Sequence, residues 1–377
     1  MKEGDGLRNV FIKNRCIGGN HPAYIIAEMS GNHAGDINRA KEIIHMAKEC
    51  GADCVKIQTY TPDTITICCD NPFFRVQNGT WNGENLYQLY GKAYTPWEWQ
   101  KELKETADQV GIDFFSTPFD KTAVDFLEEV GVEFYKIASF ELVDVPLIKY
   151  VAAKGKPIIM STGMGTLGEI EEAVKAVYSQ GNDQLILLKC SSAYPAIPED
   201  MNLRTIRNMS EIFDLPVGLS DHSMGSVGAV TAVALGACVI EKHVCMSRKI
   251  DNPDSSFSME PLELEQMVKD IRSAEKALGK VSYEVSEYEK SSVVFRKSIF
   301  AVGDIKKGDI LTEDNVRVIR PGYGLEPKYY ERILGQRALK DIDRGTPISF
   351  ELIGGMDTYE GNKALSFGGN NFISDQQ

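Results

Sequence analysis

Two of the five histidines in this sequence stand at the ends of short apolar segments. His222 ends the segment 217–222, and His243 ends the segment 239–243. If these segments are neighbouring parallel strands, both imidazoles lie over one corner of the same sheet edge. Two imidazoles with carboxylates nearby suit a hexacoordinate divalent ion, Mn²⁺ first and then Mg²⁺ or Co²⁺, with positions open for water or substrate. The carboxylates expected near this site are Glu28, Asp221, Glu241 and Asp254. The alternative is that either histidine is a general base or a hydrogen-bonded structural residue.

Two lysines, Lys56 and Lys136, stand inside apolar segments near their C-terminal ends. A buried cation is costly unless an anion compensates it, so the pair predicts a phosphate site. The alternative is that each lysine pairs with a buried carboxylate such as Glu141 or Glu241. A desolvated lysine would also serve a Schiff-base aldolase, although such an enzyme needs no metal and the histidine pair argues against it. Hydroxyls at four segment ends would complete the donors around a phosphoryl group: Thr117, Ser139, Ser161 and Ser220.

The elements that must position these residues recur eight times. Each short apolar segment runs into a polar or ionisable cluster, and segments of helical period separate them. Parallel strands joined by helical crossovers close, when there are eight, into a (β/α)8 TIM barrel whose chemistry lies at the C-terminal strand ends. The predicted strands are 24–28, 54–58, 113–117, 134–139, 157–161, 185–192, 217–222 and 239–243.

One connection is far longer than the others. It spans 61–95 and carries Trp81, Tyr87 and Tyr90. Loops of this length on the catalytic face of a barrel are usually functional, so we predict a lid that shapes the substrate site. The alternative is a structural subdomain with its own aromatic cluster.

The rest of the chain predicts a second domain. We expect a barrel with an N-terminal hairpin at 10–18 closing its floor, both within 1–280. A polar linker at 281–296 then leads to a small strand-rich domain at 297–353 and a disordered tail at 354–377. Inside the small domain the sequence AVGDIKKGDILT (301–312) returns as ALKDIDRGTPIS (338–349), which predicts two equivalent turns related by a pseudo-twofold axis.

Net charge and composition exclude several partners. A formal charge of −13 repels nucleic acid and acidic membrane surfaces. The first residues lack the apolar core of a signal peptide, and no apolar run is long enough to span a bilayer. The eight cysteines contain no CxxC pair, which disfavours structural zinc. We therefore expect a cytoplasmic protein.

A series of motifs stands in order along the chain: IIAEMSGNHAG (25–35), VKIQ (55–58), STPF (116–119), YKIAS (135–139), STGM (161–164), GLSDH (218–222), IEKH (240–243) and RPGYG (320–324). Together they resemble the sialic acid synthase (N-acetylneuraminate synthase-like) family. The resemblance implies a TIM barrel followed by an antifreeze-like SAF (β-clip) domain. It also implies a phosphoenolpyruvate-dependent nonulosonic acid synthase, a transferase that forms a C–C bond and cleaves the C–O bond of phosphoenolpyruvate.

Further motifs are similar to the pseudaminic acid synthase branch: QTYTPD (58–63), LYQLY (86–90) and TPWEW (95–99). This similarity implies condensation of phosphoenolpyruvate with 2,4-diacetamido-2,4,6-trideoxy-L-altrose and water to give pseudaminic acid and phosphate. The alternatives are an N-acetylneuraminate or legionaminate synthase that uses another acetamido sugar and, outside enzymes, a non-catalytic sugar-binding protein.

The resemblance also implies roles for individual residues. In the family the arginine that matches Arg320 reaches the substrate of the partner subunit, so a domain-swapped homodimer is expected. One departure is Ser192, where neuraminate synthases carry asparagine. The catalytic set is Glu28, Glu141, His222 and His243, with metal on the two histidines. The phosphoenolpyruvate set is Lys56, Thr117, Lys136, Ser139, Ser161, Ser192, Tyr194 and Ser220. The sugar set is Gln58, Asp254, Arg320, Tyr87 and Trp81.

Overall fold

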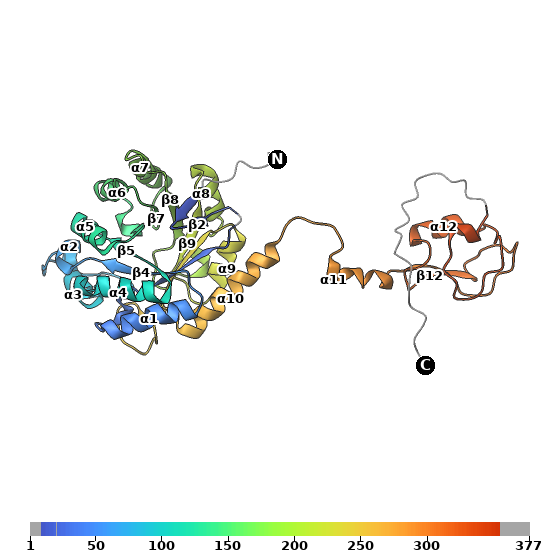
Figure 1. Cartoon of the computed structure of the whole chain (residues 1–377), viewed down its shortest axis with the longest axis horizontal. Coiled ribbons are helices and arrows are strands. Elements are labelled where there is room, and N and C mark those ends of the chain that lie inside the picture. The colour runs from blue at the N-terminus through green and yellow to red at the C-terminus, as the bar shows by residue number, and fades with distance from the viewer. Residues whose placement is uncertain (1–8, 20, 355–377) are drawn as a thin grey trace. The chain divides into compact units, whose positions relative to one another are not determined.

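The computed structural model describes residues 9–19 and 21–354 and divides the chain into two compact units, Met1–Lys280 and Val281–Gln377 (Figure 1). Apart from Gly354, the tail predicted at 354–377 lies outside the described residues. No helix within the described ranges is long and apolar enough to cross a membrane.

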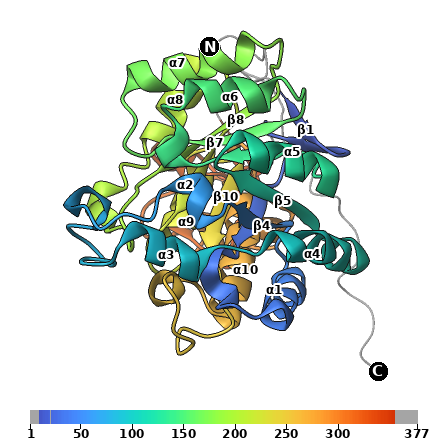
Figure 2. The same ribbon diagram turned by 90° about the vertical axis from the view of Figure 1, so that its left-hand side faces the viewer.

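The first unit is a closed barrel of eight parallel strands, in the order β10-β3-β4-β5-β6-β7-β8-β9, ringed by helices (Figure 2). The predicted (β/α)8 barrel is therefore confirmed. Three strands end earlier than predicted, because the chain turns away after residues 137, 190 and 221. The strands are β3 Tyr24–Glu28, β4 Cys54–Thr59, β5 Asp113–Pro118, β6 Tyr135–Ile137, β7 Ile158–Ser161, β8 Leu185–Cys190, β9 Val217–Asp221 and β10 Val239–His243.

Local capping chemistry begins many of the surrounding helices. Asp36 accepts a hydrogen bond from the Asn38 amide at the start of α1, and Thr166 and Glu169 form a capping box at the start of α7. The barrel helices are α1 Ile37–Glu49, α4 Trp97–Val110, α5 Lys121–Val130, α6 Val145–Ala152, α7 Leu167–Tyr178, α8 Thr205–Phe213, α9 Val227–Ala234 and α10 Pro261–Leu278.

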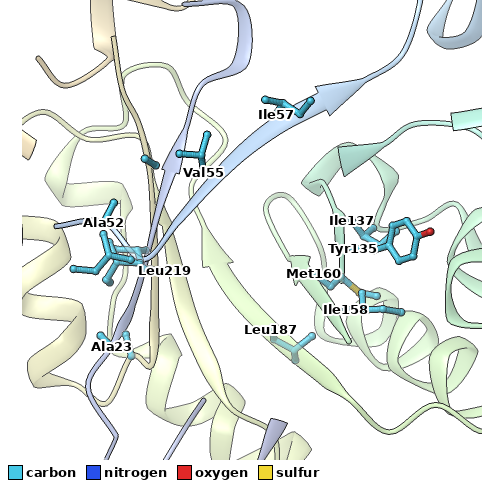
Figure 3. Close-up of a cluster of buried hydrophobic side chains, with 14 of the residues drawn as sticks. Ala23, Ala52, Val55, Ile57, Tyr135, Ile137, Ile158, Met160, Leu187 and Leu219 are labelled. Carbon is cyan, nitrogen blue, oxygen red and sulfur yellow. The ribbon is translucent and has the colours of Figure 1, made fainter. Parts of the chain in front are cut away.

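Strand alternation sorts the barrel side chains into two layers. Outward residues pack against the helices in a continuous apolar layer, which includes Val55, Ile57 and Ile137 (Figure 3). Inward residues toward the N-terminal ends of the strands form a second cluster that contains Ile26 and Phe115. The hairpin of β1 (Val10–Ile12) and β2 (Arg15–Ile17) adds Val10, Ile12 and Ile17 to this inner cluster. The prediction that a hairpin closes the barrel floor is confirmed.

The long connection contains α2 (Pro62–Ile65) and α3 (Leu86–Ala93). Short 3₁₀ turns occur in this connection and in other loops: η1 Ser30–His33, η2 Pro72–Phe74, η3 Ser139–Glu141, η4 Pro198–Asp200, η5 Ser255–Phe257, η6 Val293–Phe295, η7 Pro327–Tyr329 and η8 Phe350–Leu352.

The second unit is built on the internal repeat. Ile305 and Ile342, at matching positions of the two copies, exchange backbone hydrogen bonds of 2.9 and 2.8 Å. The Gly308 amide donates to the Ala338 carbonyl at 2.8 Å, and the Gly345 amide donates to the Ala301 carbonyl at 2.8 Å. These reciprocal bonds confirm the predicted pseudo-twofold turns. The regular elements of this unit are α11 Glu287–Lys290, β11 Ser298–Ala301, β12 Val316–Ile319 and α12 Tyr330–Ile333.

Candidate active site

Inward-facing polar side chains gather near the C-terminal ends of the strands, above the apolar cluster at the barrel floor. Because the side chains alternate with a period of two, the positions that follow the inner apolar cluster continue to point into the barrel. Glu28 comes two residues after Ile26, and Lys56 comes two residues after Cys54. The polar positions of this parity are Glu28, Lys56, Gln58, Thr117, Lys136, Ser161, Cys190, Ser220, His222, Glu241 and His243.

A buried ion cluster occupies the centre of this group. Lys56 Nζ lies 3.1 Å from Glu28 Oε2 and 3.1 Å from Glu241 Oε2. Lys136 Nζ lies 3.9 Å from Glu241 Oε1. All four side chains are almost fully buried. Of the two readings of the lysines, compensation by a buried carboxylate is therefore present in this structure, and Glu241 is shared between them.

The two carboxylates of the cluster differ in pKa and therefore in charge. Burial raises the pKa of Glu28, and Lys56 only partly opposes that effect. Burial also acts on Glu241, but Lys136 and Lys56 outweigh it and hold the Glu241 pKa below its usual value. Ser220 Oγ donates to Glu241 Oε1 at 2.9 Å and further favours the ionised form. Glu241 thus carries the permanent charge, while Glu28 can gain or lose a proton close to neutral pH.

Burial would lower the pKa of Lys56, but Glu241 and Glu28 raise it above its usual value. Burial lowers the pKa of Lys136 to about 8, because Glu241 only partly compensates and Lys56 repels a second positive charge. Burial also raises the pKa of Glu141, in η3, to about 7. Lys136 and Glu141 can therefore change charge near physiological pH, as Glu28 can.

The predicted hydroxyls surround the Lys136 side of the cluster. Lys136 Nζ donates to Ser161 Oγ at 2.6 Å. Thr117 Oγ1 is buried and has no hydrogen-bond partner among the described residues. The Gly163 amide donates to Ser139 Oγ at 3.1 Å. Of these three hydroxyls, that of Thr117 is free to donate to a bound anion.

Gly163 is placed where no larger residue fits. A Cβ atom there would lie 2.2 Å from Ser192 Oγ and 2.7 Å from Ser139 Oγ. The structure thus brings Ser139 and Ser192 together although their segments are far apart in the chain. Ser192 Oγ also lies 3.6 Å from Cys190 Sγ.

The two histidines lie side by side at the mouth of the barrel, with ring centroids 5.3 Å apart. His222 Nδ1 lies 3.1 Å from the Ser191 carbonyl, which favours a proton on Nδ1 and leaves the Nε2 lone pair free. Burial alone would lower the pKa of His222, but contact with Cys190 and with the Ser191 carbonyl raises it.

His243 provides the test of a metal site. Burial and the nearby charge of His222 hold its pKa well below the usual value, so it is neutral, the form that binds metals. Its Nδ1 atom is buried without a hydrogen-bond partner among the described residues. Over the same residues, no group of three or more His, Cys, Asp or Glu side chains could hold a metal ion. A neutral imidazole with an unpartnered nitrogen beside a second imidazole is compatible with two protein ligands to a divalent cation.

The expectation that Asp221 belongs to the oxygen ligands of this site is wrong. Asp221 Oδ2 lies 2.9 Å from Lys242 Nζ, and both side chains are buried on the outer face of the strands. The reason is strand parity, because Asp221 and Lys242 directly neighbour the inward residues Ser220 and Glu241.

An aromatic wall stands next to the histidines. The Tyr194 ring centroid lies 4.3 Å from that of His222 and 5.2 Å from that of Phe257. Trp81 from the long connection lies 5.4 Å from Tyr194, and its Nε1 donates to the Pro253 carbonyl at 2.9 Å. Burial raises the pKa of Tyr194, so its hydroxyl stays protonated. This part of the long connection therefore contacts the site, as a lid would.

Among the other sugar-site candidates, Gln58 and Asp254 lie at the barrel mouth. Gln58 Nε2 donates to Glu28 Oε1 at 3.1 Å, and Asp254 Oδ2 accepts from the Gly31 amide at 2.9 Å. The Tyr87 hydroxyl instead donates to Asp63 within the long connection, at 3.3 Å. Arg320 is an exposed residue of the second unit.

His33, in the loop after β3, caps its own loop. The Gly35 amide donates to its Nδ1 at 3.1 Å, and Thr95 Oγ1 lies 3.3 Å from its Nε2. Sequence reasoning missed Phe257 and Gly163. It placed Glu241 near the histidines and also named it as a possible counter-ion of the lysines, and Glu241 shares inward parity with His243, two residues later.

Comparisons with known proteins agree with this architecture. Residues 43–283 match the NeuB family model, and residues 296–353 match the SAF domain model. The chain is 46% identical to a pseudaminic acid synthase of Campylobacter jejuni over 85% of this chain and 94% of that protein. It is 37% identical to an N,N'-diacetyllegionaminic acid synthase of Legionella pneumophila over 90% and 99%.

A solved structure supports the same assignment. The crystal structure of an N-acetylneuraminic acid (sialic acid) synthetase from Leptospira borgpetersenii, in complex with citrate, matches with a TM-score of 0.68 and 33% identity. The match covers 76% of this chain and 96% of that one. The resemblance to the sialic acid synthase family, with its barrel and SAF domain, is confirmed. This chain belongs to the NeuB family.

Proposed function

We propose that this protein is a pseudaminic acid synthase. It joins phosphoenolpyruvate, 2,4-diacetamido-2,4,6-trideoxy-L-altrose and water, and it releases pseudaminic acid and phosphate. The observation that carries this choice is the sequence identity to members of the family, which differs from one branch to the next. Identity is 44–46% to pseudaminic acid synthases of Campylobacter jejuni and Helicobacter pylori. It is 37–39% to N,N'-diacetyllegionaminic acid synthases and 35% to a human N-acetylneuraminate-9-phosphate synthase.

The ion cluster supports phosphoenolpyruvate binding on the Lys136 side. Lys136, Ser161 and the unpartnered hydroxyl of Thr117 form an anion cradle, with Ser139, Ser192 and Ser220 close by in the same barrel mouth. Tyr194 encloses the cradle from the histidine side. Phosphate stays bound there while the C–O bond of phosphoenolpyruvate breaks.

Glu28 is the group we assign to proton transfer. Its Oε2 atom accepts no hydrogen bond from the described residues and is held only by the ion pair with Lys56. Because its pKa is raised, it can take a proton from the water that adds to C2 of the phosphoenolpyruvate unit. Glu141 is the second candidate for the same reason.

His222 and His243 are the residues that would hold Mn²⁺, or Mg²⁺ or Co²⁺ in its place. The ion supplies polarisation of the sugar aldehyde and stabilises the negative charge that develops on its oxygen. The chain's own contribution is a neutral His243, the free Nε2 of His222, and an aromatic wall that excludes water from this side.

Several features support binding of a diacetamido sugar beside the histidines. Trp81 and Phe257 offer apolar surface for acetamido methyl groups. Gln58, near the end of β4, and Asp254, just before η5, supply polar groups. We further propose a homodimer in the cytoplasm, in which Arg320 of one copy completes the sugar site of the other, as the family resemblance implies.

The test uses purified protein with Mn²⁺, phosphoenolpyruvate and one candidate aminosugar at a time, and it measures phosphate release and the nine-carbon product. We expect turnover to be highest with the L-altrose derivative. Higher turnover with a legionaminate or neuraminate precursor would reassign the branch. Sugar binding without phosphate release would indicate a sensor instead of an enzyme.

A further inference from the structure

Adjacent strands β9 and β10 carry two cross-strand pairs immediately before the two histidines. In the strand register Ser220 lies opposite Glu241, and Asp221 lies opposite Lys242. The first pair faces the interior, where Ser220 Oγ donates to Glu241 Oε1. The second pair faces the helices, with Lys242 Nζ 2.9 Å from Asp221 Oδ2. In both segments the next residue is a histidine: His222 follows Asp221, and His243 follows Lys242.

The outer pair also holds the chain beyond His222. Lys242 Nζ donates a second hydrogen bond to the Ser223 carbonyl. Asp221 Oδ1 accepts from the Ser223 amide at 2.9 Å and from Ser223 Oγ at 2.7 Å. The residue that precedes His243 is thereby bonded to the residues on both sides of His222.

These groups are enclosed. Lys242 and Asp221 are each 1% exposed, within the apolar layer between strands and helices. Helix α9 covers them closely, since a Cβ atom on Gly228 would lie 3.0 Å from Ser223 Oγ and 3.3 Å from Asp221 Oδ2. A buried ion pair contributes little stability compared with apolar residues of the same size, so stability alone does not account for charges at this place.

We propose that Asp221 and Lys242 are positioning residues, which form a clamp behind the strands that sets the separation and orientation of His222 and His243. The physical reason is that the pairing of β9 with β10 ends at Asp221. Beyond it the His222 carbonyl accepts a backbone hydrogen bond from the Ala196 amide at 2.9 Å, on the side away from β10. The clamp replaces that pairing with side-chain bonds to a strand that continues to His243. This inference rests on the proposed role of the two histidines as metal ligands.

The experiment measures Mn²⁺ affinity of the metal-free full-length protein by the loss of the free-ion electron paramagnetic resonance signal. The variant is Asp221→Asn with Lys242→Met, which removes both charges together so that neither stays buried and unpaired. We expect the Mn²⁺ dissociation constant to rise about tenfold, as for other residues that orient metal ligands. The KM for phosphoenolpyruvate at saturating Mn²⁺ should stay within about twofold of wild type, because the clamp does not touch the anion cradle; this margin is below the effect of one net hydrogen bond.

The matched control is Glu128→Gln with Lys156→Met. This pair also lies outside the strands, at 2.5 Å, but near the start of β7 instead of the histidines. Its loss should leave the Mn²⁺ dissociation constant unchanged. An equal rise in the control, or no rise in a folded clamp variant, overturns the inference. If wild type itself binds no Mn²⁺, the metal proposal fails together with it.

A milder variant keeps the test valid if the double substitution does not fold. Ser223→Ala removes only the 2.7 Å bond to Asp221 and leaves the ion pair intact. We expect it to raise the Mn²⁺ dissociation constant about threefold, the effect of one net hydrogen bond. An unchanged constant in this variant contradicts the clamp.

Discussion

The ammonium of Lys56 lies 3.1 Å from the carboxylate of Glu241, and the same ammonium lies 3.1 Å from Glu28. Two acids therefore share one cation inside the barrel, and Lys136 gives Glu241 a second partner. Removing Lys56 would take away the ion-pair partner of Glu28 and leave Glu241 with the more distant Lys136, at a cost of about 3–5 kcal/mol of folding free energy. The arrangement separates their pKa values, and the consequences can be measured.

Glu28→Gln should affect both rate and the pH dependence of stability. Because the pKa of Glu28 is raised on folding, its contribution to stability is complete below its unfolded pKa and is lost as the pH rises through the folded pKa. The melting temperature of the variant minus that of wild type should thus be larger at pH 8 than at pH 5. We also expect kcat to fall at least about a hundredfold. An equal difference at both pH values would contradict the assigned pKa direction.

Lys136→Met should lower kcat/KM for phosphoenolpyruvate about a hundredfold, through loss of a charged donor in a buried site. Because the pKa of Lys136 is about 8, the wild-type kcat/KM should also decline as the pH rises above that value. Lys136→Arg should move this decline to higher pH, since arginine stays charged.

Lys189→Met is the control for Lys136. The Lys189 ammonium donates to the Cys190 carbonyl instead of joining the ion cluster. Its loss should change kcat/KM for phosphoenolpyruvate by less than about threefold, the effect of one net hydrogen bond. Equal losses in the Lys189 and Lys136 variants would remove Lys136 from the anion cradle.

Removal of metal by a chelator should abolish phosphate release, and added Mn²⁺ should restore it. His243→Ala should prevent the restoration, because it deletes one of two neighbouring imidazoles. Metal-independent turnover, with substrate trapped on a lysine by borohydride, would instead support a Schiff base.

Trp81→Ala should raise the KM for the sugar about tenfold with little change in the KM for phosphoenolpyruvate, since Trp81 packs against Tyr194 and Phe257 beside the histidines. Tyr87→Ala serves as the comparison, because its hydroxyl bonds to Asp63 in the same connection. If both variants bind the sugar as wild type does, the aromatic residues of this connection are scaffolding.

Arg320→Ala should raise the KM for the sugar and leave the small domain folded. The repeat in that domain is held by backbone bonds between Ile305 and Ile342, which the substitution does not touch. Sedimentation should show a dimer for both proteins. Unchanged sugar kinetics would exclude Arg320 from the site.

Much of this protein could be predicted from local patterns in its sequence. Apolar runs with polar ends determine parallel strands and the end at which the chemistry gathers, because burial on both faces demands continuous apolar residues. The same pattern placed Lys136 and His243 near the ends of predicted strands, where the chemistry of a barrel lies. The internal repeat likewise determined the paired turns of the small domain.

Other features depended on contacts between segments distant in the chain, which no local pattern encodes. Only the tertiary structure decided that Glu241 compensates both lysines, and that Asp221 faces Lys242 behind the sheet. It also brought Trp81 to Tyr194 while leaving Tyr87 with Asp63. Strand register and loop packing set these partners, because a buried charge or ring takes whichever neighbour the closed barrel brings within a few ångströms.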